Sequence, residues 1–206
     1  MPVARTLLGD DARQFDAVTD ERALCWVHDG RHYAKLTPMF EPFQKELERF
    51  QDRYWAYYNE LRAYRLSPTA KEAARLDKAF DELFSTVAEY EDLAARIRKT
   101  RENKAELLLV LRHPELPLHN NDSELTVRQR KRKQDVSFGP RTAAGARAWD
   151  TMQSVVATAK KLGVNIYEYL ADRVTGRRAV PRLADVIRQR AAELNLGASW
   201  STATTS

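Results

Sequence analysis

Two acidic positions in this sequence could hold a divalent metal ion, and the first follows a short apolar run. Asp10 and Asp11 come directly after the segment from Pro2 to Leu8, which stops at Gly9. In open parallel sheets, functional groups gather beyond the carboxyl ends of the strands. A carboxylate there could hold Mg²⁺, which prefers one or two carboxylates together with water and phosphate oxygens. The alternative is an Asp that caps the following helix, which is common.

The second acidic position is Glu124, which also has two interpretations. Asn121 and Glu124 have the spacing of a capping box, and Arg128 could pair with Glu124 on the same helix face. The same geometry would hold a carboxylate rigidly in the first turn of a helix, beside amide donors and a guanidinium. There it could complete a metal site that binds phosphate. The residue pattern leaves both interpretations open.

A third cluster contains a cysteine and two histidines. Cys25 and His28 lie close together, and His32 follows four residues later. A zinc site needs four ligands, and only three candidates are near. The pattern therefore favours a buried strand end with a satisfied histidine.

Positive charge is concentrated in one segment. The chain of 206 residues has a net charge of +5, and the stretch 128–147 alone carries +6, because only Asp135 opposes its basic residues. Those basic residues are Arg128, Arg130, Lys131, Arg132, Lys133, Arg141 and Arg147. A local basic patch on a balanced body is typical of a protein that binds a polyanion. The alternative is a solvated basic helix face.

Two short apolar runs predict strands that position these residues. The runs Val3 to Leu8 and Ala23 to Val27 are compatible with buried strands of a parallel sheet, the second one stopped by the turn residues 28–30. The segment from Asp11 to Arg22 is long enough for a connecting helix.

The middle of the chain is predicted to be helical, because no glycine lies between Gly30 and Gly139. Apolar residues recur every three or four positions over 40–64 and again over 76–97. Ser67 and Pro68 between the two runs form a helix start signal. The two runs predict an antiparallel helical hairpin in which each apolar stripe closes on the other.

Five further helical segments are expected after the hairpin. They cover 104–113, the basic stretch after Asn121, 149–162, a helix capped by Asn165 that ends near Gly176, and one from Pro181 to about Leu194. Residues 196–206 are expected to form a disordered tail.

Composition excludes several classes of protein. The longest apolar run has five residues, from Leu107 to Leu111, whereas a transmembrane helix needs about 20 and a signal peptide core about 7–15. Cys25 is the only cysteine, so an internal disulfide is impossible and a cytoplasmic location is expected.

The order of these motifs resembles the insertion-sequence-66 family of transposases. The family's C-terminal signature reads Asn-Asn-x-x-Glu-Arg, then Arg-Lys, then Phe with small residues. This chain has Asn120–Glu124, then Arg128, Arg132-Lys133, Phe138-Gly139 and Gly145-x-Arg147. The block from Cys25 to His28 resembles the family's Cys-Trp-x-His block, and Ile166 to Leu170 is similar to its final Tyr-x-Tyr-Leu. The resemblance covers roughly 5–36 and 105–175.

The resemblance implies a ribonuclease-H-like catalytic domain with an Asp-Asp-Glu triad that binds two Mg²⁺ (or Mn²⁺) ions. These ions would activate water and then a DNA 3′ hydroxyl for attack on phosphodiester bonds. By this resemblance Asp10 is the second acid, with Asp11 as the alternative, and Glu124 is the third. The seven basic residues named above would contact DNA, the partner in the form of transposon ends and target.

The resemblance also implies an incomplete domain. Leu125 stands where an Arg often follows the Glu, and nine residues precede Asp10, so the strand that would carry the first Asp is absent. A truncated chain that is inactive alone is expected, with an exposed apolar strand edge that favours aggregation or dimerisation. Other chains of the same element are further expected partners.

The predicted fold is α/β and mostly helical. Residues 1–36 and 101–176 would form the partial ribonuclease-H-like core, containing its last two strands. Residues 37–100 would form the inserted hairpin, 177–195 a C-terminal helix and 196–206 the tail. Two other hypotheses remain open: a helical nucleic-acid-binding module without catalysis, and a structural protein that dimerises through the 40–97 hairpin.

Overall fold

The computed structural model describes residues 6–11, 19 and 21–194, and leaves aside the side chains of residues 122–124, 126, 129, 130, 133 and 137. The chain forms two compact units, Met1–Asn120 and Asn121–Ser206. We call them unit 1 and unit 2 and describe each by itself.

Unit 1 contains a small parallel sheet. Strand β1 (Thr6–Gly9) pairs with β2 (Glu21–Leu24), with Thr6 opposite Glu21 and Gly9 opposite Leu24. The amide of Cys25 extends the pairing by donating to the Gly9 carbonyl at 2.9 Å. The prediction of two parallel strands is confirmed. Val3 to Arg5 and most of the predicted connecting helix lie outside the described residues.

The second predicted strand is wrong after Leu24, because helix α1 (Trp26–Ala34) begins there. The amide of Trp26 donates to the Leu118 carbonyl at 3.0 Å, and that of Asp29 donates back to the Cys25 carbonyl at 3.1 Å. Cys25 is therefore the N-cap of a helix, and the expected turn at 28–30 is part of that helix.

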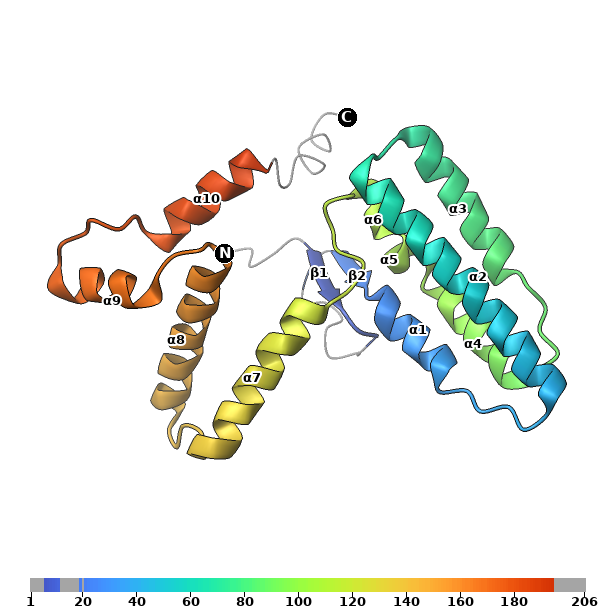
Figure 1. Ribbon diagram of the computed structural model, residues 1–206, viewed down its shortest axis with the longest axis horizontal. Helices are drawn as coiled ribbons and strands as arrows, with labels where there is room; N and C mark the ends of the chain where they lie inside the picture. The colour runs from blue at the N-terminus through green and yellow to red at the C-terminus, as the bar shows by residue number, and fades with distance from the viewer. Residues whose placement is uncertain (1–5, 12–18, 20, 195–206) are drawn as a thin grey trace. The chain divides into compact units, whose positions relative to one another are not determined.

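Three helices replace the predicted hairpin. Helix α2 (Glu41–Leu66) matches the first apolar run, but the second run is divided between α3 (Ala70–Phe84) and α4 (Glu91–Glu102). Figure 1 shows α2, α3 and α4 packed beside one another. The break follows α3, where Val87 is 92% exposed although its spacing fits the stripe.

The core of unit 1 is aromatic and lies between these helices. Trp26 is fully buried, with Tyr54 and Tyr57 of α2 each at 5.5 Å and Phe80 of α3 at 6.2 Å between ring centroids. Helices α5 (Lys104–Leu107) and α6 (Leu109–Arg112) add the buried run that contains Leu107. The apolar stripe of α2 is buried in this core, as expected for an amphipathic helix.

Unit 2 contains α7 (Asn121–Ser137), α8 (Ala143–Lys161), α9 (Ile166–Thr175) and α10 (Leu183–Glu193). The predicted helix ends are confirmed: Gly163 and Gly176 have φ of 70° and 72°, and Asn165 accepts from the amides of Tyr167 and Glu168. Among the described residues, no helix is long and apolar enough to cross a membrane.

Candidate metal and nucleic-acid site

Asp10 lies at the carboxyl end of the parallel pair. Asp10 follows Gly9, whose carbonyl accepts a hydrogen bond from the Cys25 amide. The carboxyl ends of β1 and β2 therefore meet beside Asp10. Its Oδ1 is buried and has no hydrogen-bond partner among the described residues. A buried carboxylate oxygen without a partner is costly. Asp10 therefore follows a strand of a parallel pair, as the sequence predicted.

Asp11 differs from its neighbour in its surroundings. Its carboxylate is exposed and lies 4.0 Å from the guanidinium of Arg22. The same guanidinium makes a shorter ion pair of 2.9 Å with Glu106 of α5. The two adjacent acids are thus distinguished by structure: one oxygen of Asp10 is unpartnered, and Asp11 is within reach of a cation.

A short strap, residues Leu118–Asn120, crosses the end of β2. The Leu118 carbonyl accepts from Trp26, and the Asn120 amide donates to the Cys25 Sγ at 3.3 Å. His119 lies between these two anchors, and its Nδ1 is buried without a hydrogen-bond partner among the described residues. Sequence reasoning missed His119, because only the fold places the strap at the sheet end.

Glu124 lies in the first turn of α7, which begins at Asn121. The strap leads directly into this helix, so Glu124 follows Asn120 by four positions. The Glu124 side chain lies outside the described residues, and the capping box with Asn121 therefore stays a prediction.

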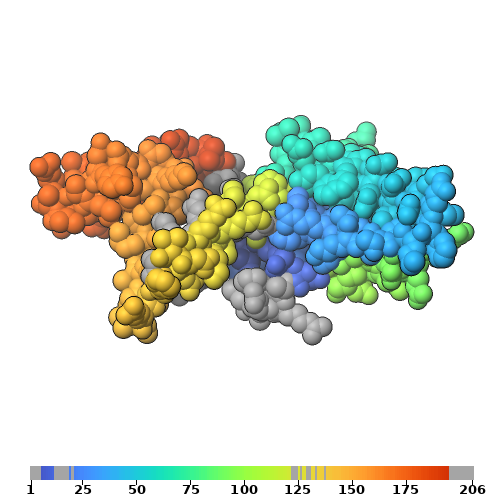
Figure 2. Space-filling model, turned by 60° about the horizontal axis from the view of Figure 1, so that its bottom comes forward, coloured from blue at the N-terminus to red at the C-terminus, as the bar shows by residue number. Residues whose placement is uncertain are grey.

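The predicted basic residues are carried by unit 2. Arg128, Lys131 and Arg132 are exposed on α7, and the helical periodicity of 3.6 places all three on one face. Figure 2 shows the described part of α7 in yellow, with its side chains at the surface. Arg141 and Arg147 are exposed before and within α8. The side chains of Arg130 and Lys133 lie outside the described residues.

The Cys25, His28 and His32 cluster is not a metal centre in the described part of the chain. Cys25 is buried as the helix cap, and His28 interacts with Arg31 at 3.2 Å. Burial and the charge of Arg96 lower the pKa of His32, which favours its neutral form. Within residues 6–11, 19 and 21–194, no three His, Cys, Asp or Glu side chains are grouped as metal ligands.

A buried ionic network that sequence reasoning missed supports the sheet end. Asp29 of α1 is 6% exposed and forms an ion pair with Arg96 of α4. It also accepts hydrogen bonds from Thr100 at 3.0 Å and from the Tyr54 hydroxyl at 3.1 Å. Burial raises the pKa of Asp29, and Arg96, Thr100 and Tyr54 oppose that rise. The network joins α1, α2 and α4, so it fixes the helix that begins next to the strap.

Comparison with known proteins identifies a family. A family model described as "Transposase IS66 family" matches residues 7–148. Among curated proteins, "Uncharacterized protein y4jO" of Sinorhizobium fredii is 35% identical over 186 residues, which cover 90% of this chain. The chain spans 57% of that relative's length. No solved structure matches the chain.

The matched region contains the sheet apart from Thr6, the ionic network, the strap and all of α7, with both predicted acids. Since the family model covers more than half of the chain, this protein belongs to the IS66 transposase family.

Proposed function

We propose that this chain is part of a DNA transposase whose ribonuclease-H-like domain cleaves and transfers DNA strands with divalent metal ions. Asp10 and Glu124 are the metal-binding carboxylates in this proposal. The observation that carries it is the buried, unpartnered Oδ1 of Asp10 at the carboxyl end of a parallel strand pair, in a chain of a transposase family.

The donor atoms fit the proposed metal. Mg²⁺ and Mn²⁺ prefer carboxylate oxygens, and a carboxylate oxygen without a hydrogen-bond partner has both lone pairs available for a metal ion. Among the described residues the Oδ1 of Asp10 is such an oxygen, whereas the carboxylate of Asp11 lies near Arg22. Asp10 is accordingly the proposed ligand.

Chain connectivity supports the participation of Glu124. The Asn120 amide donates a hydrogen bond to the Sγ of Cys25 at the end of β2. Four residues of chain span at most about 14 Å even when fully extended. The backbone of Glu124 is therefore within about 14 Å of the backbone of Asn120.

Each residue has a defined task in the proposed reaction. A bound metal ion supplies activation of the attacking oxygen and stabilisation of the leaving oxygen. Asp10 and Glu124 hold the ion in place in this proposal. Arg128, Lys131 and Arg132 bind DNA phosphates and set the position of the backbone.

Binding of Mn²⁺ to the chain tests the proposed ligands. We expect Asp10→Asn and Glu124→Gln each to weaken Mn²⁺ binding at least about 10-fold, because changes near a metal site cost about 10–100-fold even beyond the direct ligands. The free Mn²⁺ signal in electron paramagnetic resonance measures binding, with and without a DNA duplex. Asp11→Asn is the matched control and should bind as the parent does.

Two outcomes of this titration would contradict the assignment. Loss of binding in Asp11→Asn alone would make Asp11 the ligand. Unchanged binding in all three variants, with helicity preserved, would favour a helical nucleic-acid binder in which Glu124 is only a cap. Any Mn²⁺-dependent nicking of labelled duplex DNA must likewise disappear in both ligand variants.

The basic face of α7 predicts a salt-dependent interaction with DNA of any sequence. Lys131→Gln together with Arg132→Gln should lower the slope of log affinity against log salt concentration by about 1.8, since each phosphate contact contributes about 0.9. Fluorescence anisotropy with duplexes of two unrelated sequences measures the slope. Lys160→Gln with Lys161→Gln removes equal charge from exposed positions at the end of α8, and an equal effect in that pair would refute a specific role for α7.

The proposal is preferred to dimerisation through the 40–97 helices. The apolar residues of α2 that would form such an interface are buried against other helices of unit 1. A second copy would have to displace that core.

A further inference from the structure

Unit 2 contains an open pocket that the proposed catalytic role does not use. It has a volume of about 500 Å³, within the range of about 300–1,000 Å³ typical of ligand sites. Its lining comes from α8, α9, α10 and the loop before α10, and consists of Val155, Tyr169, Arg173, Arg178, Arg182, Leu183 and Ala184. All of these residues lie beyond the segment 7–148 that the family model matches.

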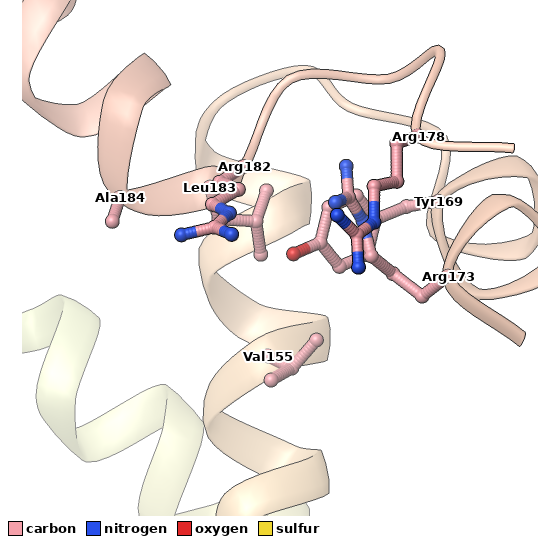
Figure 3. A pocket seen from close by; sticks show the side chains of 7 residues that line it. All are labelled: Val155, Tyr169, Arg173, Arg178, Arg182, Leu183 and Ala184. Atoms are coloured by element: carbon pink, nitrogen blue, oxygen red, sulfur yellow. The ribbon is translucent and has the colours of Figure 1, made fainter. Parts of the chain in front are cut away.

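Three guanidinium groups and no carboxylate line this pocket. Figure 3 shows Arg173 and Arg178 at the Tyr169 side chain and Arg182 beside Leu183, with Val155 below them in this view. Arg173 is stacked on the Tyr169 ring at 4.9 Å and paired with Asp172 at 3.3 Å. Arg178 and Arg182 are exposed and have no acidic partner in the described part of the chain. The pocket therefore has an excess of positive charge that an anion would neutralise.

The loop that carries Arg178 and Arg182 is fixed by buried polar contacts. Asp172 is 5% exposed, and its Oδ1 accepts from the Ala179 amide at 2.7 Å. Arg173 donates to the Val180 carbonyl. These contacts hold the loop against α9, so the two unpaired arginines are attached to a defined backbone.

The backbone at Arg178 is in an unfavourable conformation. Its φ is 55°, in the left-handed region that side-chain-bearing residues rarely adopt. Glycine would adopt this conformation without strain, as Gly176 does two positions earlier. Strained residues of this kind cluster at sites that bind ligands. The strain is a second observation, independent of charge, that marks this loop.

We propose that this pocket binds a phosphate group through Arg178 and Arg182. The planar fork of an arginine matches two phosphate oxygens, and such charge-assisted hydrogen bonds are strong. Leu183, which is buried, and Val155, which is partly buried, add apolar surface to the lining. The phosphate belongs either to the DNA backbone, in which case the site rests on the proposed function, or to a free nucleotide.

The salt dependence of DNA binding by the full chain tests the DNA source. Arg178→Gln with Arg182→Gln should lower the slope of log affinity against log salt concentration by about 1.8. Arg188→Gln with Arg190→Gln is the matched control, because both are exposed arginines of α10 that are already paired, with Asp185 and Glu193. The control should change the slope by less than half as much.

A titration with inorganic phosphate and with a mononucleotide tests the free source and does not depend on DNA binding. The amide resonances of residues 176–180 and 182–184 should shift saturably in the parent and in the control pair, and remain unchanged in the pocket variant. A slope change without shifts assigns the site to the DNA backbone, and shifts without a slope change assign it to a free phosphate. With neither effect, or with equal effects in both arginine pairs, the proposal is wrong.

Failure of the proposed transposase function would look different. A chain that binds no DNA and loses no Mn²⁺ affinity in the Asp10 and Glu124 variants could still show phosphate shifts confined to residues 176–184. The two proposals are therefore judged by separate measurements.

Discussion

Replacing Arg96 by methionine is expected to lower the free energy of unfolding of unit 1 by about 3–5 kcal/mol, the usual cost of removing one partner of a buried ion pair. Arg96 is the one cation paired with Asp29 among the described residues, and both side chains are largely buried. Methionine keeps most of the side-chain volume, so the loss reflects charge rather than packing. Asp29 would be left buried with two neutral donors, Thr100 and Tyr54.

Hydrogen exchange of α2 peptides during urea unfolding measures this loss within unit 1. Arg98→Met is the matched control, because Arg98 is an exposed residue of the same helix and the charge change is equal. We expect the control to change stability by less than about 0.5 kcal/mol. Equal destabilisation by the two variants would show that the ion pair of Arg96 with Asp29 contributes nothing to the stability of unit 1.

The pKa of Asp29 gives the same prediction a pH dependence. Burial raises this pKa above its ordinary value, so folding makes the loss of the Asp29 proton less favourable than it is in the unfolded chain. An acid with a raised folded pKa contributes stability below its unfolded pKa and loses that contribution as pH rises through the folded value. Removing Arg96 raises the folded pKa of Asp29 further, so the deficit of Arg96→Met should be larger at pH 8 than at pH 4.

Asp29→Asn should cost less than Arg96→Met at pH 8. The amide keeps an acceptor for Thr100 and Tyr54 and removes the desolvated charge, and the Arg96 guanidinium that loses its partner is more exposed (14%) than Asp29 (6%). A deficit of Arg96→Met that is the same at both pH values, or smaller than that of Asp29→Asn, would contradict this account.

Local sequence patterns correctly predicted the elements whose conformation depends on residues close to them in the sequence. The stripe of α2 follows the helical period and is buried, and Asn165 and Gly176 cap α9 as their residue types require. Asp10 follows a strand because the apolar run ends at Gly9. In each case the information lies within a few positions of the feature.

Distant contacts explain the elements that were predicted wrongly. Val87 continues the period of α3, but Ser85 and Thr86 bond back to carbonyls of α3 and end the helix. Glu46 of α2 then accepts from the amides of Glu89 and Tyr90 and starts α4. No window around residue 87 contains Glu46.

The same argument applies to the start of α1 and to the site. Trp26 begins a helix because its amide donates a hydrogen bond to the carbonyl of Leu118, which is 92 positions later. Asp29 and Arg96 are 67 positions apart, and neither belongs to a recognisable motif. The two acids were identified by type and resemblance, whereas the strap and the network that support them depend on the folded chain.

Trp26→Ala is expected to destabilise unit 1 by about 3–5 kcal/mol, as is usual when a buried tryptophan is removed from a core. Its ring is fully buried against Tyr54, Tyr57 and Phe80. Its Nε1 donates to the Leu107 carbonyl at 2.9 Å. The variant loses the ring contacts and leaves both a cavity and a buried carbonyl without its donor.

Trp26→Phe separates these two contributions. The phenyl ring keeps much of the packing but cannot donate to Leu107, so we expect a smaller loss of about 1–3 kcal/mol. Trp55→Ala is the control for loss of an indole, because Trp55 is 37% exposed and lies at the edge of the core. The same exchange experiment on α2 peptides ranks the three variants.

The location of the effect is the sharper test. Every contact of the Trp26 side chain described above lies within unit 1, so exchange of α9 peptides should be unchanged in Trp26→Ala. The backbone amide of Trp26 also holds the strap at Leu118, and the strap leads into the helix that bears Glu124. We therefore expect Mn²⁺ binding to weaken in Trp26→Ala under conditions where α9 stays protected. Parent-like Mn²⁺ binding in a chain whose α2 exchanges freely would show that the proposed metal site does not depend on the sheet end.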